Sequence, residues 1–258
     1  AGKLLPYPSL ALGAQEVLPL EMAAAYATLA NGGTRVTPTL VDRIEGPTGE
    51  TTFSGSRTRT RAFDAAPAYL ITVALQGAMD RGTAASARAL GFHGTAAGKT
   101  GTTDDYRDAW FAGYTPDLLA LVWVGFDDGD STKLTGAQAA LPIWVDFMTT
   151  AGLDTSEPFT EPSGIAWEQI DPASGGSARW SCPDSRWMAF IEGTEPPSKC
   201  RLHGWFGSWW SRREARRDER EERGSPALMQ LFCCGRVAPE EAHNEARHVI
   251  SILRGRTR

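Results

Sequence analysis

The sequence contains few of the residues on which several functional classes depend. It has only four histidines and four cysteines, and its two asparagines are Asn31 and Asn244. The net charge of −5 argues against a general nucleic-acid-binding protein, because such proteins usually carry a basic excess. The sequence has no run of about 18 apolar residues, so it predicts no membrane-spanning helix. The longest apolar run, residues 118–126, has the length of a strand.

The beginning of the chain lacks two further features. The opening residues, A-G-K-L-L-P, do not have the pattern of a secretory signal peptide, and they include no initiator methionine. We therefore expect the chain to be a piece of a longer protein. Apolar residues make up 41% of the chain and charged residues 22%, which favours a packed core over most of its length.

Helical and strand-like patterns alternate over roughly the first 150 residues. Apolar residues at helical spacing, together with terminal Pro, Asp, Asn and Gly, predict three helices, at residues 19–30, 65–81 and 138–149. Shorter apolar or β-branched runs predict five strands, of which the first two form a hairpin: residues 36–44, 50–53, 97–103, 109–115 and 118–126. The pattern indicates an α/β fold with helices packed on a sheet.

The composition changes near Gly152. Residues 153–185 are rich in Pro, Gly, Ser and Asp, as in a linker or short strands. Residues 211–223 are a charge run whose arginines and acids nearly cancel, which favours a solvated helix or linker over a polybasic membrane patch. Four aromatic residues precede this run, and we expect them to pack on a small C-terminal unit rather than to anchor at a membrane interface: Trp205, Phe206, Trp209 and Trp210. We divide the chain into 1–152, 153–204 and 205–258, the last a charged, partly helical or disordered tail.

The stretch T-A-A-G-K-T-G-T-T at residues 95–103 could hold an anion in two ways. A phosphate loop requires G-x-x-x-x-G-K-[ST], but His93 stands where the first glycine belongs, and two acids follow at Asp104 and Asp105. The alternative is a strand beside a cleft. In a strand, Lys99 and Gly101 face one side while Thr100 and Thr102 face the other, and the lysine and hydroxyls can orient a peptide carboxylate. A plain surface turn is the third possibility.

The surroundings of this stretch resemble a known family. K-T-G is the third motif of the serine acyl-enzymes that act on D-alanyl-D-alanine peptides and β-lactams. The sequence is similar to class A, bifunctional penicillin-binding proteins in several segments: P-S-L-A-L-G at 8–13, E-V-L-P-L-E-M-A-A-A-Y-A-T-L-A-N-G-G at 16–33, A-G-K-T-G-T-T-D-D-Y-R-D-A-W-F-A-G-Y-T-P at 97–116, V-W-V-G-F-D at 122–127, L-P-I-W-V-D-F-M at 141–148 and F-I-E-G-T-E-P at 190–196. The resemblance covers residues 5–150 and, less closely, 160–200.

The resemblance implies an incomplete serine β-lactamase/transpeptidase-like fold, with an antiparallel sheet and packed helices, followed by a loop-rich extension. It implies that Lys99 holds substrate and tunes the proton network around the nucleophile. Thr100 and Thr102 would bind the substrate's terminal carboxylate, the backbone N–H of Thr102 would form half of an oxyanion hole, and Gly101 would permit close approach.

The partners of this motif are missing from the sequence. No serine is followed three residues later by lysine, and neither asparagine follows a serine by two. We expect a C-terminal piece of a periplasmic transpeptidase, tethered to the inner membrane through a segment outside this sequence, and inactive alone. Its expected partners are peptidoglycan stem peptides, the lipid-linked precursor, β-lactams and the missing N-terminal part. A non-catalytic peptide-carboxylate binding module and a P-loop nucleotide binder remain as alternatives.

The cysteines allow three arrangements: a disulfide, a metal site or free thiols. A disulfide between Cys182 and Cys200 would close a loop of about 19 residues and stabilise the chain by roughly 3 kcal/mol. A metal site would add His203, Cys233 and Cys234, but the C-x-x-C spacing of common zinc sites is absent. Two reduced, buried thiols are the third possibility. We expect no metal and no cofactor.

Overall fold

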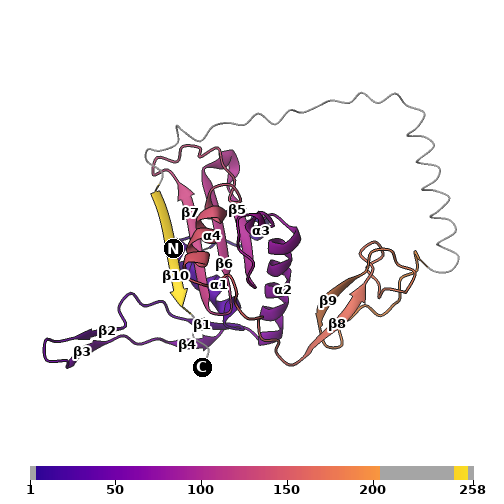
Figure 1. The fold of residues 1–258 in the computed structure, drawn as a ribbon, viewed down its shortest axis with the longest axis horizontal. Coiled ribbons are helices and arrows are strands. Elements are labelled where there is room, and N and C mark those ends of the chain that lie inside the picture. Colours follow the sequence, from indigo (N-terminus) through magenta and orange to yellow (C-terminus); the bar gives the residue numbers. More distant parts are fainter. Residues whose placement is uncertain (1–3, 204–246, 255–258) are drawn as a thin grey trace. The chain divides into compact units, whose positions relative to one another are not determined.

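The computed structural model describes residues 4–203 and 247–254 of the chain (Figure 1). The chain divides into two units, one of residues 1–163 and 244–258 and the other of residues 164–243. The division therefore lies later than the boundary predicted at residue 152. Within the described ranges, no helix is long and apolar enough to cross a membrane.

A four-stranded antiparallel sheet forms the centre of the first unit. Its strand order is β10-β7-β6-β5, with bounds β5 Ala97–Thr102, β6 Asp108–Tyr114, β7 Leu118–Gly125 and β10 Arg247–Arg254. The first three were predicted from sequence to within about a residue. The fourth lies in the segment predicted to be a helical or disordered tail, and its whole length pairs with β7.

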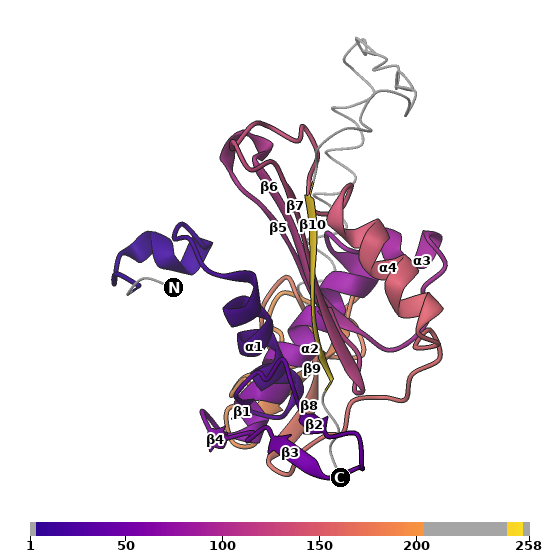
Figure 2. The ribbon, with the colours of Figure 1, turned by 90° about the vertical axis from the view of Figure 1, so that its left-hand side faces the viewer.

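Helices cover both faces of this sheet, as Figure 2 shows with α1 and α4 on opposite sides. The helices are α1 Pro19–Ala30, α2 Ala65–Arg81, α3 Ser86–Ala89 and α4 Ala140–Thr150, and the three predicted helices are confirmed. Short 3₁₀ turns occur at Pro8–Leu12 and Asp104–Tyr106. The mixed fold with antiparallel sheets and packed helices agrees with the predicted fold class.

The side-chain period of the strands builds one core on each face. Phe111 of β6 and Val122 of β7 pack with Trp144 of α4, whereas Tyr114 and Leu121 pack toward α1. Each of these five side chains is fully buried. The alternation therefore places β6 and β7 in the middle of a helix–sheet–helix arrangement, and β5 at the edge of the described sheet.

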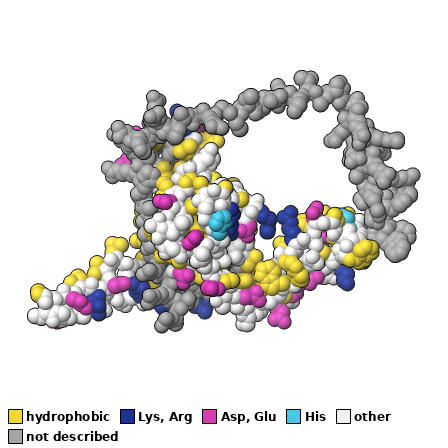
Figure 3. All heavy atoms as spheres, in the orientation of Figure 1, with side chains coloured by type: hydrophobic (Ala, Val, Ile, Leu, Met, Phe, Trp, Pro, Cys, Tyr) yellow, Lys and Arg dark blue, Asp and Glu magenta, His cyan; other side chains and the backbone are white. Residues whose placement is uncertain are grey.

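The hairpin predicted for residues 36–44 and 50–53 is only partly correct. Strand β1 Thr34–Val36 pairs with β4 Arg59–Arg61, and β2 Arg43–Glu45 pairs with β3 Thr51–Ser54. Residues 37–42 leave the ladder, because Pro38 cannot donate a backbone hydrogen bond. The β2–β3 arm is exposed, with basic and acidic side chains close together in Figure 3. Next to this arm, Arg57 donates hydrogen bonds to the Asp42 carboxylate, with Nη2 2.6 Å from each oxygen.

The second unit contains a two-stranded antiparallel sheet of β8 Ile165–Ile170 and β9 Arg186–Ile191. Loops follow both strands. Ser177 bridges them, since its N–H donates to the Ser198 carbonyl at 3.1 Å and its carbonyl accepts from the Cys200 N–H at 2.8 Å. These bonds hold the segment after β8 against the segment after β9.

Candidate functional site

Lys99 lies in the middle of β5, at the sheet edge. Its cross-strand partner is Ala112 of β6. The neighbouring positions of β5 are buried, but the Lys99 side chain is exposed and its Nζ donates to the Thr100 carbonyl at 2.6 Å. The structure therefore presents this cation on a rigid strand rather than on a loop.

Thr100 faces the opposite side from Lys99, as the predicted alternation requires. Its side chain is only 8% exposed, and its hydroxyl lies 2.7 Å from the hydroxyl of Thr83, in the turn after α2. The hydroxyl thus already has a partner within the chain. The carboxylate-binding role inferred for Thr100 stays a prediction.

Gly101 is closely surrounded on the side of β6 and of the loop before α4. A Cβ at Gly101 would lie 3.1 Å from the Cβ of Trp110. Gly136 lies over the same point, since a Cβ added there would be 2.5 Å from the Gly101 carbonyl oxygen and 2.3 Å from that of Trp110. Gly136 therefore allows backbone to approach backbone, and Gly101 leaves room for the Trp110 side chain, which is a structural reason for Gly101 beside the predicted functional one.

Thr102 ends β5 and, unlike Thr100, is exposed. Its Oγ1 accepts a 3.0 Å hydrogen bond from the Gly136 N–H. The next turn is fixed by Thr103 and Asp108, because the Asp108 N–H donates to Thr103 Oγ1 at 2.8 Å. Trp123 then donates its indole N–H to the Asp108 carboxylate at 2.8 Å. Lys99 and Thr102 are thus the exposed polar side chains of a well-anchored strand.

The geometry does not fit a phosphate loop. Such a loop curls its backbone around the anion and begins a helix at the Lys-Thr. Here the chain runs on as a strand from Gly98 to Thr102 and then enters a 3₁₀ turn at Asp104–Tyr106. The strand interpretation of this stretch agrees with the structure.

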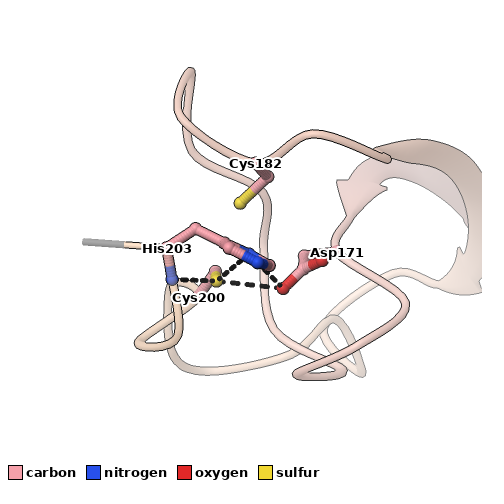
Figure 4. Close-up of side chains that lie close together, drawn as sticks. All are labelled: Asp171, Cys182, Cys200 and His203. Carbon is pink, nitrogen blue, oxygen red and sulfur yellow. Dashed lines mark hydrogen bonds and ion pairs between the residues drawn. The ribbon is translucent and has the colours of Figure 1, made fainter. Parts of the chain in front are cut away.

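A second group of polar side chains gathers in the loops of the second unit (Figure 4). It consists of Asp171, Cys182, Cys200 and His203, whose ligand atoms all lie within 4.8 Å of one another. Cys182 and Cys200 are both free thiols, so the disulfide stays a prediction. Cys233 and Cys234 lie outside the described residues, as do the aromatic cluster at 205–210 and the charge run. Asp171 could not be predicted from the sequence, because no motif spacing marks it.

Hydrogen bonds set the ionisation of this group. The pKa of Asp171 is lowered to about 2, first by the hydrogen bond from the Cys200 thiol and then by that from the Ser174 hydroxyl. The hydrogen bond with Cys200, together with the charge of Asp171, raises the pKa of His203. Asp171 is therefore a carboxylate at neutral pH although it is only 1% exposed.

Two sequence families match separate parts of the chain. Residues 7–148 match the family described as the penicillin binding protein transpeptidase domain, which covers more than half of the chain. Residues 161–204 match the family described as the penicillin-binding protein 1A, C-terminal domain. The first match lies within the first structural unit, and the second begins just before the division and lies mainly in the second unit.

Individual relatives agree with these matches. Penicillin-binding protein 1A of Pseudomonas aeruginosa is 33% identical over 244 residues, covering 74% of this chain and 29% of its own length. Penicillin-binding protein 1A of Aquifex aeolicus is 36% identical over 200 residues, covering 76% of this chain and 27% of its own. The chain thus spans less than a third of the length of these relatives.

Solved structures show the same likeness in three dimensions. The crystal structure of penicillin-binding protein 1A from Haemophilus influenzae superposes with a TM-score of 0.68 at 28% identity, over 76% of this chain and 35% of the other. That of the penicillin-binding protein PonA1 from Mycobacterium tuberculosis gives a TM-score of 0.53 at 31% identity, over 61% of this chain and 44% of the other.

Proposed function

Because the chain belongs to the penicillin-binding protein transpeptidase family, we propose that it supplies the Lys-Thr-Gly strand of a peptidoglycan D,D-transpeptidase. The supporting observation is the placement of Lys99, exposed at the centre of an edge strand whose neighbours are fixed by the sheet. The parent protein would act in the periplasm, anchored to the inner membrane, on stem peptides delivered by a lipid-linked precursor. β-Lactams would acylate the same site.

The residues of β5 have distinct roles in this reaction. The Lys99 ammonium attracts the substrate's terminal carboxylate and favours the deprotonated form of the nearby nucleophilic network. The exposed Thr102 hydroxyl donates to that carboxylate, and its backbone N–H stabilises the oxyanion of the tetrahedral intermediate. Gly101 has no side chain, so the substrate can lie close to the strand.

The nucleophile belongs to a part of the parent outside this sequence. A serine of an S-x-x-K motif would attack the penultimate D-alanine carbonyl, form the acyl-serine bond and expel the terminal D-alanine. An amine of a neighbouring stem peptide would then displace the serine and form the cross-link. Since no S-x-x-K occurs among the 258 residues, the isolated chain does not acylate.

Covalent labelling with a fluorescent penicillin tests the role of Lys99 in the parent and the inactivity of the isolated chain. We expect no labelled band from the isolated chain and a labelled band from the parent. In the parent, Lys99→Ala should slow acylation roughly 10²–10³-fold, the usual cost of removing one preorganised electrostatic contact. Lys99→Arg should restore part of the rate, and Lys133→Ala, at an exposed lysine outside β5, should leave it unchanged. Labelling of the isolated chain, or a normal rate in Lys99→Ala, would refute the assignment.

The alternative is a binding module that docks a peptide carboxylate without chemistry. It is favoured by the same exposed cation and hydroxyl, since these need no nucleophile to bind an anion. A parent that binds D-alanyl-D-alanine peptides but contains no S-x-x-K and takes no penicillin label would support it.

A further inference from the structure

We propose that Asp171, Cys182, Cys200 and His203 form a zinc site that holds together the loops of the second unit. The site is separate from the Lys-Thr-Gly strand and does not depend on the proposed transpeptidase function. It combines two sulfur ligands, one ring nitrogen and one carboxylate oxygen (Figure 4).

The fold brings the four side chains from three places in the sequence. Asp171 directly follows β8, Cys182 lies in the connection between β8 and β9, and Cys200 and His203 follow β9. The backbone bonds of Ser177 to both loops fix the first and last segments relative to each other. The ligands are therefore set by the sheet and its bridge, and not by one flexible loop.

The distances between the ligand atoms suit a tetrahedral metal. Cys200 Sγ lies 3.0 Å from Asp171 Oδ2 and 3.4 Å from His203 Nδ1, and Nδ1 lies 3.2 Å from Oδ2. A tetrahedral zinc with Zn–S of about 2.3 Å and Zn–N or Zn–O of about 2.0–2.2 Å separates its ligands by roughly 3.3–3.8 Å. These three separations need to change by only about half an ångström, and Cys182 Sγ lies within 4.8 Å of the other ligand atoms.

Burial and charge also favour a cation. Asp171 and Cys200 are each 1% exposed, and the His203 side chain is 18% exposed. Burying a carboxylate next to a thiol is unfavourable unless each is well paired. With both cysteines as thiolates, a dication would neutralise two of the three negative charges, and two protons would leave to solvent.

The ligand types select the metal. Calcium and magnesium take oxygen ligands, whereas zinc accepts cysteine, histidine and aspartate in four-coordinate sites. Because all four positions are filled by protein, no coordination site is left for a catalytic water, and the expected role is structural. A Cys182–Cys200 disulfide would use only the two sulfurs and leave Asp171 and His203 as an ordinary ion pair.

Metal analysis of the whole chain tests the proposal. The chain carries Cys233→Ser and Cys234→Ser, so that all remaining thiols belong to the site, and it is purified with and without reductant and exposed to zinc chloride. We expect one zinc per chain by mass spectrometry of the metal. Asp171→Asn, Cys182→Ser, Cys200→Ser and His203→Gln should each weaken zinc binding at least roughly tenfold, since even changes around a metal's ligands cost that much. The exposed His93→Gln is the matched control and should bind normally.

Cobalt provides a readout that does not require stable variants. Cobalt chloride added to the reduced chain should give a sulfur-to-cobalt charge-transfer band and the visible bands of a tetrahedral complex, both abolished by excess zinc. A chain that binds neither metal, or that is two hydrogens lighter and metal-free with the two cysteines linked, would overturn the proposal. Unchanged zinc content in all four ligand variants would do the same.

Discussion

Gly136 fixes the end of the Lys-Thr-Gly strand, and replacing it with alanine should destabilise the protein. Its N–H donates to Thr102 Oγ1, and its carbonyl accepts from the N–H groups of Ala140 and Leu141 at the start of α4, at 3.1 and 2.9 Å. The new methyl would lie 2.3 Å from the Trp110 carbonyl oxygen. Backbone atoms cannot turn away as a side chain can, so the loop itself must move.

The size of the effect follows from that movement. The loop has to retreat by about 1 Å to reach ordinary contact distance, which breaks the 3.0 Å bond to Thr102. Overpacking contributes about 1–3 kcal/mol and the lost hydrogen bond about 1 kcal/mol. At about 2–4 °C per kcal/mol for a chain of this size, the Tm should fall by roughly 5–15 °C.

Thermal unfolding followed by near-ultraviolet circular dichroism measures this change. Gly77→Ala is the control, and it should raise the Tm instead of lowering it. Gly77 lies inside α2, and a Cβ added there meets only the flexible end of the Arg81 side chain, at 3.6 Å. That substitution should stabilise the protein by about 0.5–1 kcal/mol. A Gly136→Ala protein that melts at the wild-type temperature would show that the loop does not approach the strand as described.

Two further predictions concern the core. Burial raises the pKa of Tyr114 to about 12, despite the opposing 2.9 Å hydrogen bond with the Thr72 hydroxyl. The raised pKa gives stability that is complete below about pH 10. The contribution of Tyr114 to the free energy of unfolding should therefore fall by about 1.4 kcal/mol per pH unit between pH 10 and 12. In denaturant titrations, Tyr114→Phe should remove this part of the fall, while Tyr26 and Tyr69, whose pKa values are also raised, keep theirs. Trp144→Phe should lower the free energy of unfolding, measured with urea, by about 1–3 kcal/mol. The reason is that the buried Gly113 carbonyl loses its 3.0 Å hydrogen bond from the indole N–H. An equal loss of unfolding free energy in Trp123→Phe, at a part-buried tryptophan, would contradict this explanation.

The sequence predicted those elements whose pattern is local. Helices α1, α2 and α4 show apolar residues at helical spacing, and β6 and β7 are apolar on both faces because helices cover both. The Lys-Thr-Gly strand could be placed because its residues alternate and its flanking segments resemble a family. The exposure of Lys99 follows from this alternation, because the neighbouring positions of the strand face the core.

Features that depend on distant residues could not be predicted. The buried Thr100 hydroxyl finds its partner in Thr83, in the turn after α2, and Gly136 approaches the Gly101 backbone from the loop before α4. Asp171 has no periodic neighbour that marks it as a partner of Cys200, so only the folded loops reveal the cluster. The polar residues of the β2–β3 arm carry no alternation, so the hairpin was predicted but its first strand was given too many residues.

The position of β10 has a consequence for the order in which the sheet forms. Strands β5, β6 and β7 follow one another along the chain, so their pairing closes only short loops. Strand β10 reaches β7 across residues 126–246, and such non-local pairing is slow compared with local contacts. A chain that folds during synthesis can therefore assemble β5, β6 and β7 before residues 247–254 have been made. Until residues 247–254 pair with it, this edge of β7 is open to other strands, and a segment far along the chain is needed to close it.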